Sequence, residues 1–276
     1  MLGLLLLQVL ASCLCLGHSE VVTSFGDCPQ FFHERTTPND VLLPQNAAWI
    51  CQRYSNSYHY ATLYDKDKRI PVYSAYKYQP GSDKRPDPGW FVEPQLIGKN
   101  DFKEMERELD LIEQHKFTLE QIKASQAVLE DYNQLIGLDR GHLNPTGHQD
   151  SRESKTATFT LTNVVPLDNT LYTGQWNFYE FTTMREKSKG CTSTYVITGA
   201  VPGDTYVVEG RINKPSHIWS AACCLVGTQP QKAWGAIAEN DKNQVENLSL
   251  GELEARLTEL YGGQTVTLFS NACPRE

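Results

Sequence analysis

Alternation of apolar and polar residues predicts a β-hairpin in the first third of the chain. Residues 60–64 and 70–78 are rich in aromatic and β-branched side chains, and the charged residues 65–68 between them have the character of a turn. Tyrosines recur along both runs. They could stack on nucleic-acid bases, but alternating tyrosines on a strand are more often half-buried sheet residues, and we favour that interpretation.

Apolar residues at helical spacing predict two helices before residue 137. Residues 101–116 place such residues on one side, with acids and bases between them, as expected of a surface helix. Thr118 and Gln121 have the spacing of a capping box, which predicts a further short helix that continues toward Tyr132. Gly137 is expected to end that helix.

A β-prone run and a helix are expected in the middle of the chain. Residues 157–165 favour a strand, which Pro166 should end. Asp168 or Asn169 can then cap a helix that extends to about Lys187.

The last third returns to strand-like runs, which cover residues 195–199, 205–208, 217–224 and 233–238. A second capping box, at Ser249 and Glu252, predicts a helix with leucines along one side. We find no repeat, low-complexity tract or linker that divides the chain. We therefore expect residues 20–276 to form one α+β domain, with a mixed or antiparallel sheet flanked by helices.

The first 19 residues have the pattern of a signal peptide. A short apolar run ends in small residues, and Gly17 and Ser19 suit signal-peptidase cleavage, although no Lys or Arg precedes the run. The run is shorter than the ~20 residues that a membrane-spanning helix needs. A buried N-terminal helix is the alternative. Since no later window is apolar for long enough to span a membrane, we expect a secreted or lumenal protein that has no membrane partner.

The cysteines agree with an oxidising compartment. Two of the eight lie within residues 1–19, which leaves six, an even number typical of a disulfide framework. These are Cys28, Cys51, Cys191, Cys223, Cys224 and Cys273. We expect Cys28 to pair with Cys51, and Cys191 and Cys273 each to pair with one of the two adjacent cysteines. A zinc site is rejected because no Cys-x-x-Cys has a partner pair.

Composition and charge exclude several classes of protein. Hydrophobic residues are 40% and charged residues 21% of the chain, which excludes disordered and collagen-like classes. The formal net charge of −8 argues against passive, charge-driven binding to nucleic acid. Acids and bases balance between residues 139 and 190, which allows a small phosphate-binding patch but no wide basic groove. Asn247 begins an Asn-Leu-Ser sequon, and glycosylation there would fit secretion.

The most informative stretch is residues 138–145, which read Leu-Asp-Arg-Gly-His-Leu-Asn-Pro. His142 can take a proton from water and Arg140 can face a phosphate, and phosphodiester hydrolysis needs both functions. By themselves these residues also fit a charged turn in which the histidine is hydrogen-bonded within the fold and has no catalytic role. His148 is close in sequence and could contact a phosphate, but we favour its interpretation as a solvated loop residue.

The surrounding stretches decide between these interpretations. The order of Asp-Arg-Gly-His, a second strand within residues 157–166, and a helix with Trp176 and Glu180 resembles the DNA/RNA non-specific endonuclease family. Residues 64–76 and 125–132 match the same family. The resemblance covers most of the mature chain and implies a ββα-metal (His-Me finger) core within the α+β domain.

The resemblance also implies a mechanism for hydrolysis of DNA or RNA. His142 would be the general base, because a pKa near the ordinary value of about 6.5 leaves the base form populated at neutral pH. Arg140 would stabilise phosphate charge or fix the loop, Asp139 would orient its neighbours, and Gly141 would allow a close backbone approach. Glu180 would hold a divalent cation, usually Mg²⁺, through water.

One position departs from the family pattern. The family's direct metal ligand is an asparagine eight residues before the glutamate, and this chain has Tyr172 there. A neutral phenol is a poor Mg²⁺ ligand. Asn169 and Asn163 are alternative oxygen donors, although roles as an N-cap and a turn former explain them equally well. The alternative function is a weakened or inactive nuclease fold that binds nucleic acid or a protein partner.

Overall fold

An eight-stranded antiparallel sheet is the largest element of the computed structural model, which describes residues 20–276. The expected signal peptide lies outside the described residues. In spatial order the strands are β1 (Val21–Val22), β2 (Ala47–Tyr54), β3 (Ser57–Asp65), β4 (Ile70–Lys77), β9 (Ser193–Val201), β12 (His217–Val226), β13 (Gln229–Glu239) and β14 (Glu246–Leu248). Each strand is antiparallel to its neighbours.

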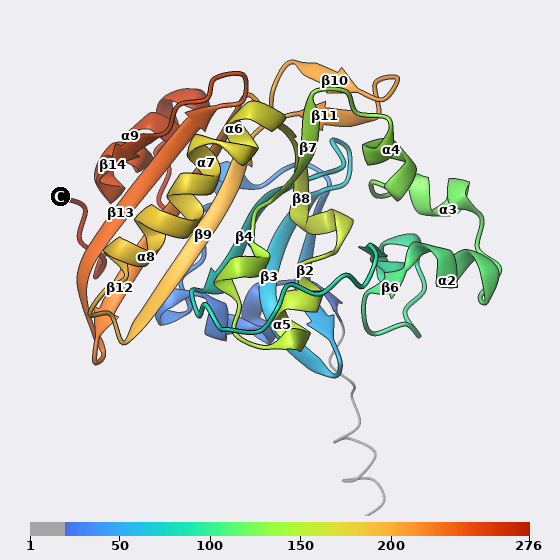
Figure 1. Ribbon diagram of the computed structural model, residues 1–276, viewed down its shortest axis with the longest axis horizontal. Coiled ribbons are helices and arrows are strands. Elements are labelled where there is room, and N and C mark those ends of the chain that lie inside the picture. Colours follow the sequence, from blue (N-terminus) through green and yellow to red (C-terminus); the bar gives the residue numbers. More distant parts are fainter. Residues whose placement is uncertain (1–19) are drawn as a thin grey trace, which may run out of the picture.

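Both faces of the sheet are covered, because side chains alternate between the two faces along each strand. The buried leucines of α9 (Leu250–Leu260) pack on one face, in a cluster with Ile197 and Trp219. A second cluster, which includes the neighbouring residue Val196, covers the opposite face. Figure 1 shows α6, α7 and α8 lying along β9, β12 and β13 on that second side. Their bounds are α6 (Asn169–Thr173), α7 (Gln175–Phe178) and α8 (Met184–Lys187), and the π-helical turn η8 (Tyr179–Thr183) joins α7 to α8.

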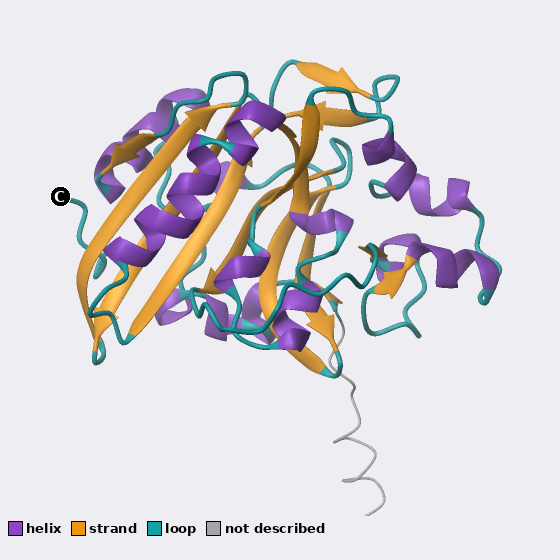
Figure 2. Ribbon diagram, viewed as in Figure 1, coloured by secondary structure: helices purple, strands orange, loops and turns teal. Residues whose placement is uncertain are grey.

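A separate two-stranded ribbon lies beside these helices (Figure 2). β7 (Leu138–His142) pairs with β8 (Val164–Asp168), and the chain continues from β8 directly into α6. This order of two strands and a helix is the ββα unit that the sequence predicts. Two smaller ribbons are β5 (Phe91–Val92) with β6 (Glu106–Arg107) and β10 (Thr205–Val207) with β11 (Ile212–Lys214).

Several local predictions are confirmed. β3 and β4 form the expected hairpin. Its tyrosines Tyr60, Tyr64 and Tyr76 are sheet residues, as expected, but they are fully and not half buried. Capping boxes begin α3 (Leu119–Lys123) and α9 at Thr118 and Ser249. These signals succeed because a cap is made by residues only three positions apart.

Residues 157–165 do not form the predicted strand. They include the end of α5 (Arg152–Ala157) and a 3-10 turn at Leu161–Asn163, and only then does β8 begin. Pro166 lies inside β8, opposite Arg140, and does not end it. A strand of a two-stranded ribbon has one unpaired edge, so a proline without an N–H is tolerated there.

The helix predicted over residues 101–116 is also much shorter. Only α2 (Glu108–Glu113) is helical, because Glu106–Arg107 is used as β6. The next predicted helix is divided into α3 and α4 (Leu129–Asn133), with residues 124–128 between them. Tertiary pairing therefore overrides helical spacing in this segment.

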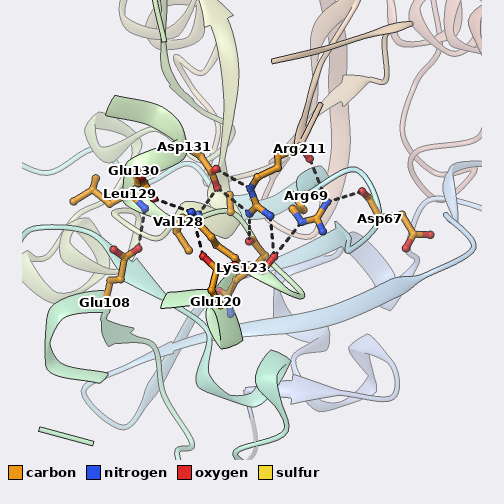
Figure 3. Close-up of polar contacts among 12 residues, drawn as sticks. Asp67, Arg69, Glu108, Glu120, Lys123, Val128, Leu129, Glu130, Asp131 and Arg211 are labelled. Carbon is orange, nitrogen blue, oxygen red and sulfur yellow. Dashed lines mark hydrogen bonds and ion pairs between the residues drawn. The ribbon is translucent and has the colours of Figure 1, made fainter. Parts of the chain in front are cut away.

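A network of charged side chains attaches α3 and α4 to the rest of the domain (Figure 3). Arg211, just before β11, donates from Nε to Oδ1 of the buried Asp131 on α4 at 2.9 Å. Its Nη1 also donates to the carbonyl oxygen of Lys123 at 3.2 Å. Arg69, before β4, donates to the same carbonyl and to the carbonyl of Arg211, both at 3.3 Å. A buried carboxylate without its cation is costly, so this pair fixes the position of α4.

All six cysteines of the described chain are paired. Cys28 bonds to Cys51, as expected, and the remaining pairs are Cys191–Cys224 and Cys223–Cys273. Cys223 and Cys224 are neighbours on β12, so their side chains point to opposite faces of the sheet. Cys224 belongs to the cluster on the side of α6–α8, whereas Cys223 and Cys273 belong to the cluster on the side of α9.

Within residues 20–276, we find no helix with the length and apolar character needed to cross a bilayer.

The opposite orientation of Cys223 and Cys224 makes the disulfide connectivity testable in a chain that begins at Glu20. The double variant Cys191→Ala/Cys224→Ala should have no free thiol on titration under denaturing conditions. It should unfold with a free energy about 3–4 kcal/mol lower than the parent, since one loop closure is lost.

The matched control removes one cysteine from each of the two bonds. Cys191→Ala/Cys223→Ala should show two free thiols, because Cys224 and Cys273 lie on opposite sides of the sheet. A thiol-free Cys191→Ala/Cys223→Ala protein would contradict this connectivity.

Candidate active site

The ββα unit brings His142 to the end of β7. His142 pairs in register with Val164, and Gly141 pairs with Val165. A Cβ atom at Gly141 would lie 2.7 Å from the Cβ of Leu167, so only glycine lets the two strands pack here. The close backbone approach that the sequence predicts at Gly141 is therefore an approach to Leu167 on the paired strand β8.

Asn163 holds the segment that follows His142. Its Oδ1 accepts hydrogen bonds from the backbone N–H of Asn144 at 3.0 Å and from the hydroxyl of Ser74 at 2.9 Å. Its Nδ2 donates to the carbonyl oxygens of Asn144 and Thr158 at 3.1 and 3.0 Å. The side chain is fully buried, and these four bonds occupy its hydrogen-bonding capacity.

The imidazole of His142 is 3% exposed and is surrounded by aromatic rings. The ring centroids of Trp90 and Phe159 lie 5.5 and 5.6 Å from it. Its Nδ1 is 3.5 Å from the hydroxyl of Tyr172, and its Nε2 is buried and has no hydrogen-bond partner among the described residues. Burial, followed by the charges of Arg85 and Arg140, lowers the pKa of His142 to about 3. The ring is therefore neutral at physiological pH.

Glu180 lies in the π-helical turn that follows α7. Asp168 begins the helical segment as an N-cap, and its side chain accepts from the N–H of Leu171 at 2.9 Å. Glu180 is almost fully buried, and its Oε1 accepts from Nε1 of Trp176 at 3.0 Å. Burial raises the pKa of Glu180 to about 8, against the opposing effects of Trp176 and Arg85. A cation in contact with this carboxylate would favour its charged form.

His148 is buried, so its interpretation as a solvated loop residue is wrong. Its Nε2 donates to the carbonyl oxygen of Glu180 at 2.9 Å, and its Nδ1 lies 3.0 Å from the hydroxyl of Tyr76. A carbonyl only accepts, so Nε2 carries the proton and Nδ1 accepts from the tyrosine. Burial lowers the pKa of His148 to about 4. His148 therefore connects the π-helical turn to β4.

A cleft of about 230 Å³ contains both His142 and Glu180. It is lined by Arg85, His142, Pro145, Thr146, Gly147, Tyr172, Thr173, Asn177, Glu180 and Phe181. Among these lining residues, Arg85 carries the positively charged side chain. It belongs to a loop that was not predicted from the sequence to lie at the site. Among the described residues, Arg85 forms no salt bridge. Its guanidinium carbon lies 5.1 Å from the centroid of the Phe159 ring.

The loop that carries Arg85 is held by the buried Lys155 of α5. The ammonium group donates to the carbonyl oxygen of Gly81 at 3.1 Å and also to that of Asp83. The N–H of Gly81 donates to the carbonyl oxygen of Gln149 at 3.1 Å. These contacts place a loop distant in sequence over the end of β7.

Other residues expected at the site have different positions. Arg140 does not line the cleft; its guanidinium lies 4.9 Å from the centroid of the Trp90 ring and donates to Asn133. Asp139 is half-buried on β7 and also lies outside the cleft lining. Asn169 begins α6 but does not line the cleft, and the amide of Asn163 is occupied in the core.

The whole arrangement matches a known protein family. Residues 37–271 match the model of the DNA/RNA non-specific endonucleases, and the chain belongs to that family. The resemblance inferred from residues 138–145 and the following helix is thus confirmed.

Two curated relatives are endonuclease domain-containing 1 proteins. The chain is 32% identical over 267 residues to the Homo sapiens protein, which covers 92% of this chain and 49% of that protein. It is 30% identical over 241 residues to the Mus musculus protein, which covers 84% of this chain and 46% of that one. The chain therefore spans about half the length of the curated relatives it matches.

A solved structure shares the fold. The EndoG/EndoGI complex, described with the mechanism of EndoG inhibition, matches with a TM-score of 0.51 and 16% identity. The match covers 76% of this chain and 83% of that chain. It supports the α+β class with a ββα-metal nuclease core.

The buried His148 predicts a dependence of stability on pH in EDTA-treated protein. Its folded pKa is depressed below the unfolded value of about 6.5, so its stabilisation is present above that value and is lost as pH falls toward 4. Between pH 7 and 5, the free energy of unfolding of the wild type should fall by about 2 kcal/mol more than that of His148→Gln. Urea unfolding at each pH measures this difference.

The exposed His115 provides the matched control, and His115→Gln should follow the wild-type profile. Parallel profiles for wild type and His148→Gln would show that His148 does not titrate in this way.

Proposed function

We propose that this protein is a divalent-metal-dependent endonuclease that hydrolyses phosphodiester bonds of DNA or RNA, with His142 as the general base. The observation that carries the proposal is the imidazole of His142, which lines the cleft that also contains Arg85 and Glu180. The ring is neutral, and its Nε2 has no hydrogen-bond partner within residues 20–276. Family membership supports the reaction class, since nucleases of this family act on nucleic acid.

In the proposed step, His142 takes a proton from a water molecule. The water oxygen forms a bond to phosphorus, the bond to the leaving oxygen breaks, and solvent supplies the proton for that oxygen. Burial keeps the imidazole in its base form, so no deprotonation is needed before the reaction. A base with a low pKa is a weak proton acceptor, and contact with an anionic phosphate should raise that pKa and strengthen it.

Arg85 is the proposed phosphate-binding cation. It lines the cleft, forms no salt bridge with the described residues, and presents the planar fork that suits a phosphate. The sequence suggested this role for Arg140, but that guanidinium is committed to Trp90 and Asn133. We therefore propose that Arg140 has a positioning role.

The cleft also has oxygen donors that suit a hard divalent cation such as Mg²⁺. Glu180 supplies a carboxylate, and Asn177 and Thr173 supply neutral side-chain oxygens on the same wall. When bound, the cation would offset the charge that develops on the phosphate and the leaving oxygen. We propose Glu180 and Asn177 as the ligands, in place of Asn169 and Asn163, which do not line the cleft.

A weakened nuclease fold that binds nucleic acid is the second candidate function. The observation that favours it is Tyr172, which stands at the family's metal-binding position, with its hydroxyl 3.5 Å from Nδ1 of His142. Burial raises the pKa of the phenol above its ordinary value, so it stays neutral and remains a poor ligand for Mg²⁺.

We also propose that the mature protein is secreted, with a glycan on Asn247. Three disulfides are typical of the secretory pathway or the extracellular space. Asn247 is exposed on β14, which is an edge strand of the sheet, so its side chain is accessible to glycosylation.

Cleavage of plasmid DNA and of RNA by the purified protein tests the enzyme. We expect cleavage with Mg²⁺, none with EDTA, and a loss of at least ~100-fold in rate for His142→Ala, because the general base is removed. Arg85→Ala should lose more activity than Arg140→Ala, since only Arg85 lines the cleft. Equal inertness of wild type and His142→Ala across divalent metals would refute the catalytic proposal.

Tyr172→Asn restores the family's ligand and should increase both metal affinity and cleavage. Calorimetric titration with Mn²⁺ gives the affinity independently of activity, and we expect it to rise about tenfold or more. Tyr172→Phe removes the hydroxyl without adding a ligand and is the matched control. An unchanged Mn²⁺ affinity in Tyr172→Asn would show that this tyrosine does not limit metal binding.

A further inference from the structure

Two exposed phenylalanines lie on the helix that carries Glu180. The side chains of Phe178, at the end of α7, and Phe181, in the π-helical turn, are 55% and 46% exposed. They are three residues apart, a spacing that puts side chains on neighbouring positions of one helix face. Between them, Tyr179 and Glu180 are buried. The end of α7 and the π-helical turn together therefore bury a carboxylate and expose two aromatic rings.

Phe181 connects this aromatic pair with the cleft. It lines the cleft together with Arg85, His142 and Gly147. A single exposed phenylalanine needs no explanation, but Phe181 lies at the wall of a cleft that contains Arg85, which forms no salt bridge with the described residues. Phe178 is exposed three residues away on the same helical segment.

Gly147 determines where the ring of Phe181 lies. A Cβ atom at Gly147 would be only 2.3 Å from Cε1 of Phe181, so the absence of a side chain allows the ring to pack against the backbone. The contact holds the ring at the cleft wall, although nearly half of its surface stays open to solvent.

We propose that Phe178 and Phe181 form a stacking platform for bases next to the scissile phosphate, and that the preferred ligand is single-stranded nucleic acid. This inference rests on the proposed function, because the phosphate at Arg85 determines which nucleotides reach the rings. Aromatic side chains stack on bases of any sequence, which fits a non-specific site. In a duplex the base faces are covered by neighbouring bases, so only an unpaired strand presents them without an unstacking cost.

The chemistry of the site favours nucleic acid over an apolar protein segment. A strand bound here would meet Arg85 for its phosphate and Phe181 for a base in one cleft, with Phe178 exposed on the same helical segment. Because the formal net charge of the chain is −8, stacking would supply affinity that charge does not.

The test measures binding in the His142→Ala background with Mg²⁺, so that cleavage does not interfere. Fluorescence anisotropy compares a labelled 12-nucleotide oligothymidylate with a 12-base-pair duplex. Phe178→Leu and Phe181→Leu keep an apolar side chain but remove the aromatic face. Each should weaken binding of the single strand by roughly tenfold, and should change binding of the duplex by less than about twofold.

Two further variants control for unspecific effects. Tyr206→Leu changes an equally exposed aromatic residue on β10, outside the cleft, and should leave binding unchanged. Gly147→Ala should displace the ring of Phe181 and weaken single-strand binding as Phe181→Leu does. A ring at the end of a flexible side chain can move aside, so the melting temperature of Gly147→Ala should stay close to that of the parent.

The binding measurements test the stacking platform, and the cleavage assay tests the proposed catalytic function, so the two proposals can fail independently. If Phe178→Leu and Phe181→Leu bind the single strand as the parent does, the platform is refuted, even when the wild type cleaves nucleic acid. A fall in affinity of the same size in Tyr206→Leu, or on the duplex, also refutes it. If the rings are needed for single-strand binding but the wild type never cleaves, the platform stands and the catalytic proposal fails.

Discussion

The buried amide of Asn163 joins the parts of the molecule that make the site. It bonds to the backbone just after His142, to the loop at Thr158 and to Ser74 on the central sheet. An amide in the core is costly unless all its groups are paired, and here all of them are. The position of His142 therefore depends on a residue that does not line the cleft. The sequence suggested Asn163 as a metal ligand, but its oxygen is committed within the fold.

Burial then determines the charges of the two central groups. Burial lowers the pKa of His142 and raises that of Glu180. Removal from water therefore favours the neutral form of both groups when no ligand is bound. A neutral imidazole is ready to accept a proton, but a neutral carboxyl is not ready to hold a cation. The charge of Arg85 lowers the pKa of Glu180, but burial outweighs it, so the carboxyl stays neutral without a further positive partner.

Local signals in the sequence predicted local structure well. The capping boxes at Thr118 and Ser249, the cap at Asp168 and the β3–β4 hairpin depend on residues close together in the chain. The failures involve long-range pairing. Residues 106–107 leave the predicted helix to pair with residues 91–92, and the run before Pro166 becomes a helix end and a turn. His148 seemed solvated because nothing nearby in sequence buries it, whereas Tyr76 and Glu180 do so in the fold.

The sequence by itself determined the family, the α+β class, the position of His142 on a strand and the pairing of Cys28 with Cys51. These predictions follow from motifs and residue spacings that can be recognised in the sequence alone. Only the tertiary structure decided which cation lines the cleft, because Lys155 brings the loop of Arg85 there from more than fifty residues away. It also decided the partners of Cys223 and Cys224. Adjacent residues on a strand face opposite sides of a sheet, and a linear sequence does not say which side is which.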